Sequence, residues 1–149
     1  MSPRFNHIAL SVPSSLLDDA GRDEIVRFYD DLFGWNEMPT MTKPYQQLVL
    51  QAYTYEQFVF LIANDEPMTT ARMDHFGMSV QTQDEYDTFH AKAVAAAEAD
   101  DRVTFIDNGA ETFGDFLTLH SFYIGHLLPM MIEVQYYDWA DGITPDGGN

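Results

Sequence analysis

The sequence predicts an α+β fold in which one βαβββ module occurs twice, and three observations support this prediction. The segment 6–12, NHIALSV, recurs at 74–80 as DHFGMSV. Each copy is followed by an Asp-Glu pair and a phenylalanine that open an amphipathic helical pattern. Three short extended segments then follow each expected helix. A duplicated supersecondary unit explains all three observations.

The first element of each module is a strand, at 6–12 and at 74–80. Alternation places His7, and in the second copy His75, on the face opposite to the large apolar side chains. Those apolar side chains are Ile8, Leu10 and Val12 in the first copy and Phe76, Met78 and Val80 in the second. Because a duplicated strand can bring two imidazoles together about a pseudo-twofold axis, His7 and His75 are candidate metal ligands.

The second element is a helix, expected at about 22–33 in the first module and at about 83–98 in the second. Gly34 follows the first helix and is a typical C-cap. The spacing of the repeat falls from 68 residues (6 to 74) to 61 residues (23 to 84), which places a longer loop at 13–22. Pro, Ser-Ser and Asp-Asp in that loop supply turn chemistry.

Three short strands complete each module. The expected strands are 35–40, 46–53 and 57–63 in the first module and 103–107, 116–124 and 130–137 in the second. The turn-rich segment 64–67, NDEP, is the expected linker. The sequence therefore predicts a first module at 1–66, a second at 67–138 and a flexible tail at 139–149.

Composition excludes several classes of function. With 7 Lys and Arg against 24 Asp and Glu, the formal net charge of -17 disfavours nucleic acid and anionic membranes as partners, and solubility is its simplest explanation. The longest wholly apolar stretch, 58–63, is too short to span a bilayer, and no secretory segment precedes the first strand, so a cytoplasmic location is expected. Because the chain has no cysteine, nitrogen and oxygen would hold any metal.

The last expected strand adds a carboxylate to the two histidines. Glu133 and Gln135 alternate with Ile132, Val134 and Tyr136, so Glu133 lies opposite an apolar face. Each of the three residues alone is more often structural, but two histidines and one carboxylate form a set that binds a divalent first-row metal and leaves coordination positions open. The predicted metal ligands are thus His7, His75 and Glu133.

Several of these motifs resemble the vicinal oxygen chelate superfamily. They are the opening at His7, the helix end RFYDDLFGW at 27–35, the second histidine at His75 and the strand around Glu133. The superfamily includes glyoxalase I, extradiol dioxygenases, fosfomycin-resistance enzymes, methylmalonyl-CoA epimerase and bleomycin-binding proteins. The likeness runs from Phe5 to about Tyr137. It implies two modules that form a half-open mixed β-barrel around a cavity, with the helices outside, and a homodimer.

The resemblance also implies a particular ligand set. Metal ligands of the superfamily fall by position on His7, His75 and Glu133. Superposing the module ends pairs Ile62 with Glu133, so the fourth ligand of glyoxalase I and the epimerase is missing, unless a register shift brings in Glu56 or Gln57. Three ligands resemble the extradiol arrangement, which favours Fe2+, with Mn2+, Ni2+, Zn2+ and Co2+ as alternatives.

The expected catalytic residues are His120 and Tyr123. His120 alternates with Thr118 and Phe122 and could face the cavity of Glu133, so it is the candidate proton shuttle, although a cross-strand structural histidine is the commoner case. Tyr123 would share that face only if the strand bulged. His126 departs from the Asp-Pro-x-Gly turn of the superfamily and is expected in a loop without an assigned role, and His90 is expected to be exposed and inert.

Two functions remain open at this level. The first is a metal-dependent enzyme of the glyoxalase or dioxygenase type, whose small-molecule substrate chelates the ion through adjacent oxygens in ring cleavage, lyase or isomerase chemistry. The alternative is a metal-free ligand-binding or drug-sequestering protein, similar to the bleomycin-resistance proteins, for which the negative charge would suit a cationic drug. Aromatic side chains expected around a cavity in either case are Tyr45, Tyr53, Tyr55, Phe113 and Phe122.

Overall fold

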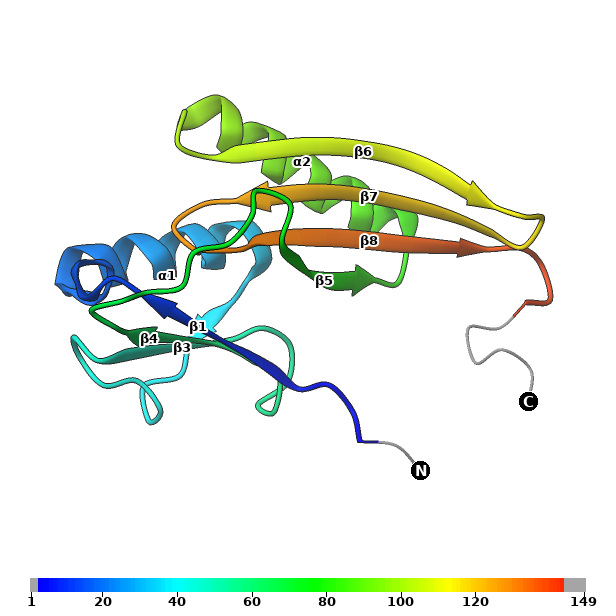
Figure 1. Ribbon diagram of the computed structural model, residues 1–149. Coiled ribbons are helices and arrows are strands. Elements are labelled where there is room, and N and C mark those ends of the chain that lie inside the picture. The colour runs from blue at the N-terminus through cyan, green and yellow to red at the C-terminus, as the bar shows by residue number, and fades with distance from the viewer. Residues whose placement is uncertain (1–2, 144–149) are drawn as a thin grey trace. The chain divides into compact units, whose positions relative to one another are not determined.

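The computed structural model describes residues 3–143 and divides the chain into two compact units (Figure 1). The first unit contains the described residues up to Ala71 together with Leu127–Pro129. The second contains Arg72–His126 and the described residues from Met130 on. Each unit holds one four-stranded mixed sheet and one α-helix, so the predicted α+β class is confirmed. No helix among the residues 3–143 is long and apolar enough to cross a membrane.

The first unit has the predicted order of one strand, one helix and three strands. Its sheet has the order β1-β4-β3-β2, in which β1 runs parallel to β4 and the other pairs are antiparallel. The elements are β1 (His7–Val12), the 3-10 turn η1 (Ser14–Leu17), α1 (Asp19–Phe33), β2 (Asn36–Glu37), β3 (Gln47–Gln51) and β4 (Phe58–Ala63).

Local signals account for both ends of α1. The side chain of Asp18 accepts a hydrogen bond from the Gly21 backbone N–H, which starts the helix three residues earlier than expected. Gly34 takes the left-handed conformation with φ 71°, and its N–H donates to the Asp30 carbonyl, as the C-cap prediction required. The next residue, Trp35, is fully buried and stacks on Tyr29 with ring centroids 5.0 Å apart.

The first sheet has one packed face and one face that carries His7. Leu10 and its register partner Leu61 are both buried at or below 1% exposure. On the opposite face, His7 stacks on its register partner Phe58, with ring centroids 4.7 Å apart and planes 9° from parallel. The alternation read from the sequence is therefore correct for β1.

The second unit repeats the same topology. Its sheet has the order β5-β8-β7-β6, with β5 parallel to β8 (Figure 1). The elements are β5 (His75–Val80), α2 (Gln83–Ala99), β6 (Thr104–Phe113), β7 (Leu117–Gly125) and β8 (Met131–Trp139). The tail expected at 139–149 begins inside β8, at Trp139, and from residue 144 on it lies outside the described residues.

Helix α2 covers one face of the second sheet (Figure 1). It begins at a capping box in which the Thr82 hydroxyl accepts from the Glu85 N–H while the Glu85 carboxylate accepts from the Thr82 N–H. Tyr86 on α2 packs against Phe122 on β7, with ring centroids 5.6 Å apart. The opposite face of this sheet is the one that carries Glu133.

The strand registers correct one detail of the sequence alignment. Ala9 pairs with Phe60 on β4, whereas Gly77, its counterpart on β5, pairs with Glu133 on β8. The residue equivalent to Glu133 is therefore Phe60 and not Ile62, because the equivalent residues His7 and His75 pair with Phe58 and Met131. The side chain at this place is apolar in either alignment.

Candidate metal centre

The second unit brings His75 and Glu133 into contact. The two residues lie on the neighbouring parallel strands β5 and β8, and His75 Nε2 is 3.3 Å from Glu133 Oε2. The register partner of Glu133 is Gly77, so no side chain on β5 stands directly beside the carboxylate. Glu133 is 7% exposed, which makes it one of the few buried charged residues among those described. A buried carboxylate requires a cation, a proton or several hydrogen bonds.

The orientation of the His75 ring is fixed by the backbone. His75 Nδ1 lies 2.7 Å from the Met73 carbonyl oxygen, which can only accept a hydrogen bond. In the neutral imidazole the proton therefore resides on Nδ1, and Nε2 presents a lone pair. That lone pair faces the Glu133 carboxylate, which is unfavourable unless a proton or a metal ion lies between the two atoms.

Tyr123 completes this group from the adjacent strand β7. It is the register partner of Glu133, and its ring meets the His75 ring edge to face at 5.1 Å. Burial raises the pKa of the Tyr123 hydroxyl, with further contributions from its hydrogen bond to Glu133 and from the charges of Glu133 and Glu111. Tyr123 therefore stays protonated at neutral pH and donates to the carboxylate.

His120 lies on the other face of the sheet, which corrects the expectation that it shares the face of Glu133. Its ring centroid lies 5.8 Å from that of Tyr86 on α2 and 5.7 Å from that of Tyr136 on β8. The pairing of β7 with β8 is unbroken from Leu117 to Ile124, so no bulge changes the alternation between His120 and Tyr123. Tyr123 occupies the place that the sequence suggested for His120.

His7 in the first unit has a hydrogen-bond acceptor beside Nδ1, as His75 has in the second. Its Nδ1 lies 2.9 Å from the Asn6 side-chain oxygen, and Phe58 stacks on the ring. An acceptor at Nδ1 leaves Nε2 as the atom that can bind a metal, a feature common to metal-binding histidines. Sequence reasoning identified both histidines but missed their partners, although the polar residue Asn6 directly before His7 was a usable signal.

The donor atoms suit a divalent first-row metal. Imidazole nitrogen and carboxylate oxygen are ligands that Mn2+, Fe2+, Co2+, Ni2+ and Zn2+ accept, and a ligating histidine needs the Nδ1 partner that both histidines have. The residues therefore fit such an ion chemically. A thiolate-dependent metal site is excluded because the chain has no cysteine.

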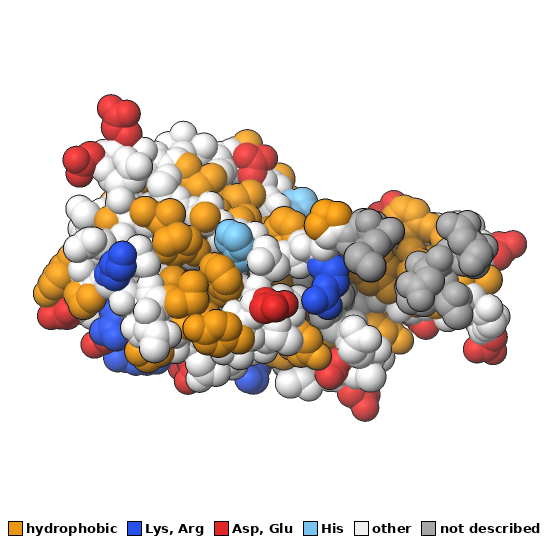
Figure 2. All heavy atoms as spheres, turned by 90° about the horizontal axis from the view of Figure 1, so that it is seen from below, with side chains coloured by type: hydrophobic (Ala, Val, Ile, Leu, Met, Phe, Trp, Pro, Cys, Tyr) orange, Lys and Arg blue, Asp and Glu red, His pale blue; other side chains and the backbone are white. Residues whose placement is uncertain are grey.

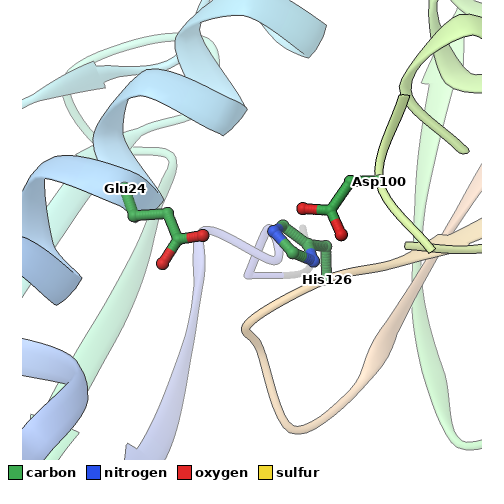
Figure 3. Close-up of side chains that lie close together, drawn as sticks. All are labelled: Glu24, Asp100 and His126. Atoms are coloured by element: carbon green, nitrogen blue, oxygen red, sulfur yellow. The ribbon is translucent and has the colours of Figure 1, made fainter. Parts of the chain in front are cut away.

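The remaining histidines of the second unit have structural partners. His126 is buried, and Figure 3 shows it beside Asp100, which follows α2. Hydrogen bonds from Arg102 lower the pKa of Asp100 to about 2, and the charge of His126 adds a smaller contribution. Glu24, also drawn in Figure 3, lies on α1 of the first unit.

His90, which was expected to be exposed, is half-buried between α2 and β6. Its Nε2 lies 3.2 Å from an Asp107 carboxylate oxygen, and its ring meets Phe105 and Phe122 edge to face at 5.4 and 5.5 Å. These contacts attach the helix to the sheet, so His90 has a packing role.

Comparison with solved structures establishes the fold. The chain is similar to a putative glyoxalase family protein from Bacillus anthracis, with 15% identity, a TM-score of 0.63 and coverage of 93% of this chain and 98% of that one. A glyoxalase/bleomycin resistance protein from Albidiferax ferrireducens matches with 17% identity, a TM-score of 0.58 and coverage of 89% and 98%. No protein-family model and no curated protein sequence matches the chain.

A third similar structure carries a metal. It is a variant of the fosfomycin resistance protein FosX from Listeria monocytogenes, complexed with Mn(II) and 1S,2S-dihydroxypropylphosphonic acid. The identity is 14%, the TM-score is 0.55, and the match covers 90% of this chain and 92% of that one. The fold of this chain is thus the vicinal oxygen chelate fold that the sequence motifs predicted.

Proposed function

We propose that this chain is a metal-dependent enzyme that binds a small molecule through two adjacent oxygen atoms. The observation that carries the proposal is the 3.3 Å approach of His75 Nε2 to the buried Glu133 carboxylate while His75 Nδ1 is held by a backbone carbonyl. A divalent cation shared by these two atoms removes the repulsion of their lone pairs and neutralises the buried charge.

His7 is the proposed third ligand. Its support is chemical: His7 has the same place in its module as His75 has in the second, and its Nδ1 is also held by an acceptor. Two imidazoles and one carboxylate leave several positions of a first-row metal open for a chelating substrate. The apolar Phe60 at the place equivalent to Glu133 offers no fourth ligand.

The ion would supply Lewis-acid stabilisation of negative charge on the substrate oxygens, and redox chemistry with O₂ if it is Fe2+. Tyr123 then acts as the proton donor. Its raised pKa keeps the hydroxyl protonated at neutral pH, and the hydrogen bond to Glu133 holds that hydroxyl beside the ligand set. Tyr123 therefore replaces His120 in the proposed mechanism.

Fe2+ and Mn2+ are the proposed ions. Fe2+ follows from the three-ligand set, which resembles the extradiol arrangement, and Mn2+ is supported by the FosX complex. The ligand in that complex, a dihydroxypropyl compound, carries two adjacent hydroxyl groups. Both dioxygenase reactions and lyase or isomerase reactions are compatible with this proposal. The proposal also includes assembly of the chain into a homodimer.

The alternative is a metal-free binding protein. In that case a proton on His75 Nε2 would form an ordinary ion pair with Glu133 at the observed 3.3 Å. The similarity to a glyoxalase/bleomycin resistance protein is compatible with this function. Metal content separates the two functions.

The test is elemental analysis of protein without a histidine tag after anaerobic loading with Fe2+, Mn2+, Ni2+ or Zn2+. We expect about one equivalent of metal in the wild type and a large loss in His75→Ala. The matched control is His90→Ala, which removes a histidine that pairs with Asp107 instead and should keep its metal. Less than about a tenth of an equivalent of every ion, or full metal content in His75→Ala, would contradict the proposal.

Activity is then sought with a panel of diols, catechols and thiol adducts while O₂ uptake is followed. O₂ consumption with a catechol identifies the dioxygenase branch, and turnover without O₂ identifies the lyase or isomerase branch. Tyr123→Phe should lower kcat even at saturating metal, because it removes the hydroxyl that donates the proton. It should also weaken metal binding, because that hydroxyl is a hydrogen-bond partner of Glu133.

A further inference from the structure

The first unit contains a pocket of about 870 Å³ at the start of β1 and the connection between β3 and β4. This volume is typical of sites for small organic ligands. Its lining is rich in aromatic side chains, and we call it the aryl pocket. The aromatic lining residues are Phe5, Tyr53, Tyr55 and Phe58, with Met41 as an additional apolar side chain.

Three of these rings are exposed to solvent. Phe5 is 81% exposed, Tyr53 79% and Tyr55 62%. Figure 2 shows hydrophobic side chains exposed on one face of the molecule. A single exposed hydrophobic side chain is common on the surface of any protein. Several large aromatic groups around one pocket are less common, and they mark a surface that gains free energy when a ligand covers it.

The aryl pocket adjoins His7. Phe58 lines the pocket and stacks on the His7 ring at 4.7 Å. Asn6 also lines the pocket and holds His7 Nδ1 at 2.9 Å. The aryl pocket is therefore adjacent to the His7 ring, the proposed metal ligand of the first unit.

The charged groups at the pocket compensate each other. Arg4 and Glu56 lie 3.8 Å apart, and both are largely exposed. Thr54 donates to the Gln57 side-chain oxygen at 3.1 Å, which orients that amide at the pocket wall. Because the charges of Arg4 and Glu56 cancel, the aromatic lining favours an uncharged planar group over an ion.

We propose that the aryl pocket binds an uncharged planar aromatic group of the substrate, whose two adjacent oxygens lie at the metal. The substrate class is thus an aryl-bearing compound with vicinal oxygens. This inference rests on the proposed function for the placement of the oxygens, whereas recognition of the aryl group depends only on residues of the first unit.

The first measurement uses metal-free protein and 2-naphthol as a neutral aryl probe, followed by its fluorescence. Tyr53→Ser should weaken 2-naphthol binding about tenfold, because it removes one ring face from the pocket. The matched control is Tyr45→Ser. Tyr45 is 55% exposed in the same unit, does not line the pocket and should leave the affinity within about twofold of the wild type. No binding, or equal loss in both variants, overturns the inference.

The second measurement adds Mn2+ and follows broadening of the 2-naphthol proton resonances by NMR. We expect broadening in the wild type and its loss in His7→Ala when both are compared at equal occupancy of the pocket by 2-naphthol. If Mn2+ binds without broadening the probe, the pocket does not adjoin the metal and the inference is overturned. If Mn2+ does not bind but 2-naphthol binding still depends on Tyr53, the proposed function fails and aryl recognition by the pocket is supported.

Discussion

Replacing Glu133 by Gln removes the charge of the proposed carboxylate ligand and keeps the size of the side chain. Loss of a hydrogen-bond partner of a ligand usually costs 10- to 100-fold in metal affinity, so loss of the ligand charge should cost at least about 100-fold, or about 2.7 kcal/mol. Water screens this charge little, because Glu133 is 7% exposed. The equivalent residue of the first module is the apolar Phe60. Titration calorimetry with Mn2+ at about 0.15 M salt measures the change.

The control for this variant is Glu111→Gln. Glu111 belongs to the same sheet, and its charge acts on Tyr123. It is not a proposed ligand, because the carboxylate that His75 contacts is that of Glu133. Its substitution should change the Mn2+ affinity by no more than about threefold, since the ion then feels only a screened charge. Equal weakening in both variants would mean that net charge attracts Mn2+ without a defined site. A Glu133→Gln variant with wild-type affinity would refute the ligand assignment.

Two further predictions concern single side chains. Asn6→Ala should weaken Mn2+ binding about tenfold by calorimetry, because it removes the acceptor at His7 Nδ1. This is the lower end of the range of about 10- to 100-fold, because His7 is exposed. The control Asn36→Ala removes an amide that donates to the Gly34 carbonyl and should leave Mn2+ binding unchanged. Burial raises the pKa of Tyr86 from 10.0 to about 12, so the unfolded state loses the proton first and the free energy of unfolding should fall as pH rises. Urea unfolding measures the free energy of unfolding at about pH 9 and about pH 11. Its decrease between these pH values should be about 1 kcal/mol smaller in Tyr86→Phe than in the wild type. An equal decrease in both proteins would contradict the raised pKa of Tyr86.

The repeated module was predictable because its signals are local. The recurring strand pattern, the capping box at Thr82 and the C-cap at Gly34 each depend on a few neighbouring residues. The end of β6 was not predictable in this way. Asn-Gly after Asp107 is a common turn signal, but Gly109 takes φ 69° at a β-bulge, and the strand continues to Phe113.

The candidate site was predictable only in part. Alternation within one strand placed His75 and Glu133 on the correct faces, because a period of two does not depend on the partner strand. The contacts of Tyr123 and His120 depend on the register between β7 and β8 and on the packing of α2, and no residue within β7 encodes either. The acceptor at His75 Nδ1 is a main-chain carbonyl, which no side-chain pattern can reveal.

The two acceptors that hold the histidines give the two proposed ligands, His7 and His75, unequal freedom to vary. At His7 the acceptor is the side chain of Asn6, so one codon change can release or retune the ring. At His75 the acceptor is the carbonyl of Met73, which persists whatever amino acid occupies position 73. If the proposed function holds, directed evolution of metal preference should therefore accumulate substitutions around His7, while the orientation of the His75 ring persists.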